Sequence, residues 1–188
     1  MKKIRPAFLL ILGLLFIGWV FVAPQAIHAT SSIPPNLAKA APEFAYQNSD
    51  AWINSPPLTI EQLRGKVVLL DFWTFGCWNC YRSFPWLNKL EARYHAKGLQ
   101  VIGIHTPEFP HEKVRSKVVA KVKKFNLHHP IMMDNDFQYW NAMNNRYWPA
   151  FYILDKKGRI RASFYGETHT GDPQAKAIQQ TIEQLLAE

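Results

Sequence analysis

The chain has 188 residues, of which 48% are hydrophobic, and its formal net charge is +8 at pH 7. This length suits one well-buried domain, and the hydrophobic fraction is that of a globular protein. Nucleic-acid binding would require clustered basic residues interleaved with base-stacking aromatics. We therefore expect the positive charge to lie on a solvated surface and expect no nucleic-acid partner.

The N-terminus has the pattern of an export signal. Lys2, Lys3 and Arg5 precede an uncharged apolar run over residues 7–23. The run is at the lower length limit for a membrane-spanning helix, so residues 1–30 are expected to be either a cleaved signal peptide or a retained membrane anchor. The remainder carries 19 Lys and Arg against 14 Asp and Glu, a net charge of +5. We expect an exported protein, periplasmic or on the outer face of the cytoplasmic membrane.

The next segment separates this N-terminus from the folded part. Residues 31–42 are rich in Ser, Pro and Ala and show no apolar periodicity, which is typical of a linker. The folded domain is therefore expected over residues 43–188. Thr59 with Gln62 three residues later resembles a short capping box in the segment that precedes the first predicted strand.

The first half of the domain has the pattern of a strand, helix, strand unit. Residues 67–72 form a near-continuous apolar run, which predicts a central strand covered on both faces. Helical spacing follows over residues 77–97, and Gly98 is expected to end that helix. Residues 99–104 are the next strand, parallel to the first across a right-handed connection. Apolar residues at helical spacing then predict a helix over 112–126.

The second half predicts an antiparallel end to the sheet. Residues 130–133 are a short apolar stretch, and residues 135–144 have the pattern of a short helix. Residues 150–154 and 159–164 flank a turn and predict a β-hairpin, before a final helix over 173–187. The order of elements predicts an α/β fold with a central mixed β-sheet flanked by helices.

Cys77 and Cys80 are the only cysteines of the chain. They lie two residues apart between a predicted buried strand and a helix N-terminus, which is the arrangement of a reactive dithiol. The N–H groups of the first helical turn and the positive end of the helix dipole favour a thiolate on Cys77. We expect Cys77 to be the nucleophile, Cys80 the resolving thiol, and their redox-active disulfide to need no other cofactor.

Three motifs are spaced along the chain: Asp71-Phe72-Trp73, Cys77-Trp78-Asn79-Cys80 with Pro85 five residues later, and Trp148-Pro149 before a predicted strand. Together they resemble the active-site region of thioredoxin-fold proteins, in which the last proline is cis and packs beside the dithiol. The exported TlpA-like branch, and its DipZ-like domains in particular, is similar over residues 42–188. That likeness rests on blocks at residues 52–55, 63–69, 105–110 and 145–150. Trp78 departs from the subgroup, which usually has Ile there.

Asp71 and Pro149 are candidate catalytic residues beside the dithiol. Asp71 ends an apolar strand six residues before Cys77, and a buried carboxyl there would have a raised pKa suited to exchanging a proton with Cys80. The alternative is an Asp held by local hydrogen bonds at a strand end. Pro149 removes a backbone N–H and, if cis, presents the preceding carbonyl to an extended client. The alternative is a simple turn proline.

Four further residues are candidates for contact with a client or for tuning the dithiol. Trp73 and Trp78 are expected to form an apolar rim that binds a client, with core packing as the alternative for Trp73, and Trp148 is expected to bind the client beside Pro149. Glu108 follows the second strand and is either an acid, base or tuning charge near the dithiol or a solvated loop residue. Four histidines have no metal-ligand spacing and are expected in loops or on the surface: His105, His128, His129 and His169.

These residues favour an exported thiol:disulfide oxidoreductase. The Cys77 thiolate would attack a disulfide, and Cys80 would resolve the mixed disulfide. The resemblance implies a reductase whose partners are client proteins with disulfides or thiols and a membrane electron-relay thiol protein.

Two other functions stay open at this point. A peroxiredoxin-like thiol peroxidase would explain Thr74 three residues before Cys77, although Leu70 stands where those enzymes have proline. A non-catalytic module could hold Cu(I) with both thiolates and a histidine, although such proteins usually space their cysteines more widely.

Overall fold

The computed structural model describes residues 33–188, so the expected signal or anchor at residues 1–30 lies outside the described residues. The strands of this part are β1 (Trp52–Ile53), β2 (Val67–Trp73), β3 (Leu99–His105), β4 (Ile131–Met133), β5 (Ala150–Leu154) and β6 (Ile160–Tyr165). The α-helices are α1 (Trp78–Tyr94), α2 (Arg115–Lys124), α3 (Gln138–Ala142) and α4 (Pro173–Ala187). Short 3-10 turns occur at Ser49–Ala51, Glu61–Leu63, His95–Lys97 and Pro110–Lys113.

The strands form one mixed sheet in the order β1-β4-β3-β2-β5-β6. The three central strands β4, β3 and β2 are parallel, whereas β5, β6 and β1 each run antiparallel to their neighbours. This confirms the predicted mixed sheet, the parallel β2–β3 pair and the β5–β6 hairpin. The short edge strand β1 was not predicted, because two residues carry no recognisable period.

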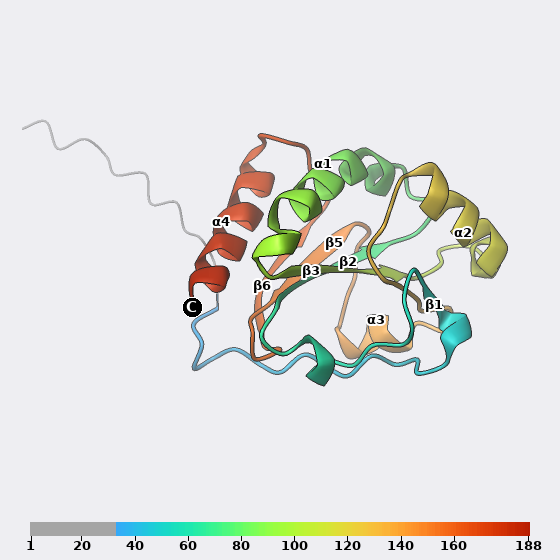
Figure 1. The fold of residues 1–188 in the computed structure, drawn as a ribbon. Helices are drawn as coiled ribbons and strands as arrows, with labels where there is room; N and C mark the ends of the chain where they lie inside the picture. Colours follow the sequence, from blue (N-terminus) through green and yellow to red (C-terminus); the bar gives the residue numbers. More distant parts are fainter. Residues whose placement is uncertain (1–32) are drawn as a thin grey trace, which may run out of the picture.

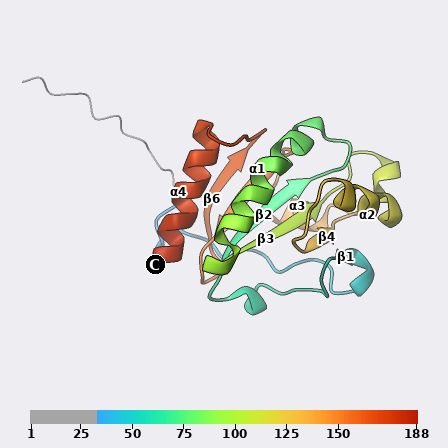
Figure 2. The same ribbon diagram turned by 45° about the horizontal axis from the view of Figure 1, so that its top comes forward.

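Helices cover both faces of the sheet (Figure 1). One face carries α1, α2 and α4, and Figure 2 shows α1 lying across the central strands beside α4. The other face carries α3 and the N-terminal segment. Alternate residues of β2 therefore enter two separate cores: Leu69 and Trp73 pack under α1, and Leu70 and Phe72 pack toward α3.

The helix over residues 77–97 is confirmed as α1 followed by a 3-10 turn, and Gly98 ends it with a left-handed φ of 104°. The helix expected over residues 112–126 is instead a 3-10 turn and the shorter α2. The two are separated at Val114, whose extended backbone breaks the helical hydrogen bonding.

The segment expected to be a linker is attached to the sheet from residue 33 onward. The Ile33 N–H donates to the Arg161 carbonyl, and Lys39 accepts from the Ile160 N–H. Arg161 is buried, and its guanidinium donates to the Ile33 carbonyl and to Glu188, the last residue. One side chain therefore binds both ends of the described chain. Among residues 33–188, no helix has the length and apolar character needed to cross a bilayer.

Candidate active site

The dithiol lies where β2 passes into α1. Cys77 is the N-cap of α1, and its sulfur accepts a hydrogen bond of 3.1 Å from the Cys80 N–H. The two cysteines form a disulfide. Cys77 is partly exposed and Cys80 is fully buried. An attacking group can therefore reach the Cys77 sulfur, whereas Cys80 can react only from inside the site. The helix N-terminus stabilises negative charge on the outer sulfur when the pair is reduced.

Asp71 is buried in β2, two residues from Trp73 and on the face that α1 covers. Burial raises the pKa of its carboxyl to about 8. Its Oδ2 atom has no hydrogen-bond partner among the described residues. A buried carboxyl of this kind can hold a proton near neutral pH and release it to a neighbouring base.

A second carboxylate, Glu112, supports the loop that precedes Cys77. Its Oε2 atom accepts hydrogen bonds from the Thr74 hydroxyl at 2.7 Å, the Glu108 N–H at 2.6 Å and the Phe109 N–H at 3.0 Å. Burial raises the pKa of Glu112, but these hydrogen bonds outweigh it and hold the pKa below its usual range. A Cβ atom on Gly76 would clash with Glu112 Oε1, so a larger residue here would have to displace the Glu112 carboxylate. Gly76, which precedes the nucleophile Cys77, is therefore packed against the carboxylate of Glu112.

His105, at the end of β3, is buried behind the same loop. Its ring contacts the Trp73 ring at 4.8 Å between centroids and stacks on Phe75 at 5.8 Å. Burial lowers the pKa of His105 to about 4, so the ring is neutral at physiological pH. The expectation of a loop or surface position was wrong for His105, which is buried in β3; His129 lies in a loop as expected, but its side chain is buried.

The peptide bond between Trp148 and Pro149 is cis, as the resemblance implied. Pro149 is buried, and its carbonyl accepts from the Gly166 N–H at 2.9 Å. The partly buried Trp148 packs on Trp140 with ring centroids 4.2 Å apart. A shallow pocket of about 380 Å³ is lined by Tyr147, Trp148, Tyr165 and Gly166. Aromatic surface is therefore available next to the cis-proline.

The sequence profile of the Redoxin family matches residues 37–179, which is most of the chain. The chain belongs to the Redoxin family. This redoxin is 42% identical to Protein DipZ of Mycobacterium tuberculosis over 119 residues, which are 62% of the chain and 17% of DipZ. The chain thus spans about a sixth of the length of that relative.

Two relatives that this chain covers over almost their whole length are named thiol-disulfide oxidoreductases. Thiol-disulfide oxidoreductase YkuV of Bacillus subtilis is 30% identical over 153 residues, covering 81% of this chain and 97% of YkuV. Thiol-disulfide oxidoreductase ResA of Bacillus cereus is 26% identical and covers 89% and 91%. The crystal structure of the thioredoxin-like superfamily protein SPOA0173 superposes with a TM-score of 0.70 at 26% identity, covering 80% and 98%. The redoxin therefore has a thioredoxin-like fold, and its Cys77–Cys80 pair lies at the start of α1.

The other predicted residues of the redoxin separate into core and surface positions. Trp73 is fully buried and contacts Phe84 edge-on, so it takes the core-packing position that was its alternative. Trp78 is 67% exposed beside Cys77 and fits an apolar rim. Glu108 is exposed and meets Glu112 only through its backbone N–H. The buried carboxylate of this loop is therefore Glu112, which sequence reasoning missed.

Within residues 33–188 no group of three or more His, Cys, Asp or Glu side chains is arranged to hold a metal ion. The site's chemistry is that of an accessible sulfur, a buried sulfur and a protonatable carboxyl on the α1 face. These parts suffice for thiol:disulfide exchange.

Proposed function

We propose that the redoxin is an exported reductase that reduces disulfides in client proteins. The observation that carries this proposal is the pairing of a partly exposed Cys77 at a helix N-terminus with a fully buried Cys80. In such a pair one sulfur meets the client and the other can only attack within the protein. Export is supported by Lys2, Lys3 and Arg5 ahead of the apolar run at residues 7–23.

The reaction starts from the reduced pair. The Cys77 thiolate attacks one sulfur of a client disulfide, forming a mixed disulfide and releasing the other client sulfur as a thiolate that takes a proton from solvent. Asp71, as the carboxylate, takes the proton of the Cys80 thiol. The Cys80 thiolate then attacks the Cys77 sulfur, which forms the Cys77–Cys80 disulfide and releases the second client thiolate. The client gains two electrons, and the redoxin loses two.

The client would bind over the aromatic surface around the dithiol. Trp78 offers an exposed ring at the first turn of α1, and Tyr147 and Tyr165 flank the cis-proline. Tyr147 and Tyr165 contact each other with ring centroids 5.3 Å apart, and exposed large hydrophobic side chains of this kind are typical of a binding surface. The buried Pro149 would fix the carbonyl of Trp148 for a backbone hydrogen bond with an extended client.

The proposed reductase needs a source of electrons, because each turnover leaves the Cys77–Cys80 pair oxidised. Outside the cytoplasm, that source would be a thiol protein that relays electrons across the membrane. If residues 7–23 stay in the bilayer, they hold the redoxin close to such a partner.

The direct test is to trap clients. Cys80→Ala should leave clients bound to Cys77 as mixed disulfides, and the matched Cys77→Ala variant should trap none. The reverse pattern would exchange the roles of the two cysteines. The direction of the reaction is tested in cells of the source organism by alkylating free thiols. A reductase should hold its pair mostly as the dithiol, and a fully oxidised pair would contradict this direction.

A further inference from the structure

A buried histidine and a carboxylate form a pair away from the dithiol, between the C-terminal half of α1 and the loop before β4. The Nδ1 atom of His129, in the loop before β4, lies 3.1 Å from Oε2 of Glu91 in α1. The His129 side chain is fully buried, and the Glu91 side chain is 16% exposed. The mechanism proposed above uses neither residue. A buried ionisable pair is costly unless its remaining polar atoms also find partners.

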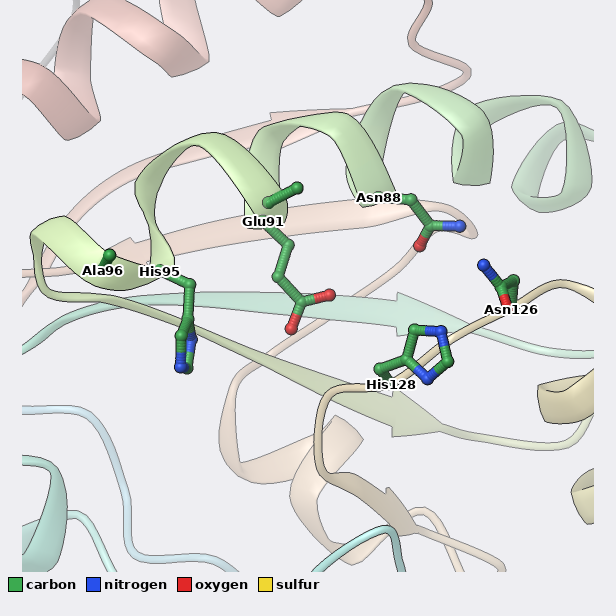
Figure 3. A pocket seen from close by; sticks show the side chains of 7 residues that line it. Asn88, Glu91, His95, Ala96, Asn126 and His128 are labelled. Carbon is green, nitrogen blue, oxygen red and sulfur yellow. The ribbon is translucent and has the colours of Figure 1, made fainter.

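Glu91 opens onto a pocket of about 560 Å³ between α1 and the loop that follows α2. Figure 3 shows its carboxylate pointing into this pocket between His95 and His128, with Asn126 at the other end. We call this space the α1 pocket. Glu91 therefore connects a buried histidine with a solvent-accessible space.

The other ring nitrogen of His129 points toward Gly103 in β3. A Cβ atom on Gly103 would lie 3.0 Å from Trp73 Nε1, 3.0 Å from Ile131 Cγ1 and 3.4 Å from His129 Nε2. Neither nitrogen has a hydrogen-bond partner among the described residues. An indole N–H donates and an imidazole nitrogen can accept, so the two nitrogens can bind one water between them.

Asp71 is the strand partner of Gly103. The register of β2 and β3 places the two residues side by side, and neighbouring strands are about 4.8 Å apart. Asp71 shares its sheet face with Trp73, whose indole nitrogen lies at Gly103. Asp71 Oδ2 is also buried without a hydrogen-bond partner among the described residues, on the strand next to Gly103. A water over Gly103 that also reached Asp71 Oδ2 would have the three partners that a buried water normally has.

We propose that His129 and Glu91 relay protons between Asp71 and the α1 pocket. The first step crosses one water molecule held over Gly103. This inference rests on the proposed function, because it supplies the route by which the Asp71 proton reaches solvent. His129 and Glu91 are positioning residues for Asp71 and make no contact with the client.

The relay moves one proton in each half of the cycle and no electrons. When the client is reduced, Asp71 holds the proton from Cys80 and passes it through the water to His129 Nε2. Nδ1 passes a proton to the Glu91 carboxylate, which releases it into the α1 pocket. When the pair is reduced again, the same steps run backwards and return one proton to Cys80. The ring proton of His129 thus moves from Nδ1 to Nε2 in the first half of the cycle, and the reverse steps of the second half restore the starting tautomer.

The test is single-turnover reduction of insulin by the reduced redoxin, followed by tryptophan fluorescence. His129→Gln and Glu91→Gln should each slow the turnover at least about tenfold, since general acid–base groups typically contribute 10²–10⁴. The reduction potential at pH 7 should not change, because a relay alters rates only. His128→Gln is the matched control: it lies in the same pocket without a bond to Glu91, and its rate should equal that of the wild type.

Two further variants separate the relay from a structural role. Gly103→Ala places a methyl group in the space of the water and should slow turnover while leaving His129 and Glu91 in place. His129→Ala should recover speed when imidazole is added, because imidazole can replace the lost ring. A structural loss would show no such rescue.

The outcomes separate the two proposals. A wild-type redoxin that fails to reduce insulin would count against the proposed function itself. A wild type that reduces insulin, with His129→Gln and Gly103→Ala reacting at the wild-type rate, would overturn the relay alone. Equal slowing in His128→Gln, or slow His129→Ala without imidazole rescue, would also overturn it.

Discussion

Replacing Asp71 by Asn should make the redoxin more stable, and the gain should grow with pH. Burial raises the pKa of Asp71 from 3.8 to about 8. Between these values the folded protein keeps a proton that the unfolded chain has released, so the stability of the wild type falls as pH rises across this interval. Asn cannot ionise, and its variant avoids this penalty.

The size of the effect follows from the pKa change. One pKa unit corresponds to about 1.4 kcal/mol, so ionisation of the unfolded chain between pH 3.8 and pH 7 costs the folded wild type about 4 kcal/mol. At pH 5 the cost is about 2 kcal/mol, and above pH 8 it no longer grows. The free energy of unfolding of Asp71→Asn should therefore exceed that of the wild type by about 2 kcal/mol at pH 5 and about 4 kcal/mol at pH 7.

The assay is urea unfolding of the oxidised protein at pH 5, 7 and 9, followed by tryptophan fluorescence. Keeping Cys77 and Cys80 oxidised removes their titration from the comparison. Asp50→Asn is the control, because Asp50 is exposed and its variant should stay within about 0.5 kcal/mol of the wild type. A stability difference for Asp71→Asn that is the same at pH 5 and pH 9 would refute the reasoning. After its Cys77–Cys80 pair has been reduced, Asp71→Asn should also reduce insulin more slowly than the reduced wild type.

Three further predictions concern other parts of the molecule. Glu112→Gln should cost about 1 kcal/mol at pH 7 in urea unfolding, because a neutral amide accepts weaker hydrogen bonds. Folding lowers the pKa of Glu112 below 4.5, so the cost of Glu112→Gln should shrink as the pH is lowered below 4.5. A cost that does not change with pH would contradict this prediction. Trp78→Ala should leave stability within about 0.5 kcal/mol but raise the KM for a client about tenfold; an unchanged KM would remove Trp78 from the binding surface. Residues 1–30 fused to a phosphatase that needs disulfides should give active enzyme in cells, and an inactive fusion that is still produced would argue against export.

The part of the fold around the dithiol could be predicted because its signals are local. An apolar run, two cysteines at a helix start and Gly98 at the helix end lie within about thirty neighbouring residues and follow known periods. The position of Trp148-Pro149 came from the family resemblance, since no local pattern places it beside a strand 80 residues earlier.

Residues whose environment depends on distant partners could not be predicted. Glu112 lies among His111 and Lys113 and has the local sequence of a solvated turn, but it is buried through a hydrogen bond to Thr74, 38 residues earlier. His129 is likewise buried against Glu91, also 38 residues away. Burial of this kind is decided by tertiary packing, which leaves no period in the sequence.

Arg161 binds both ends of the described chain, so its place in the sheet decides which side of the redoxin faces anything attached to Ile33 or Glu188. Arg161 lies near the start of β6, and the register through β5 places that end of the sheet opposite the end where β2 leads to Cys77. The seven residues of β2 separate these ends by about 20 Å. A tether at Ile33 or a tag at Glu188 therefore leaves the reactive sulfur uncovered. A redoxin held to a bilayer through residues 7–23 would be held from the end of the sheet opposite its dithiol.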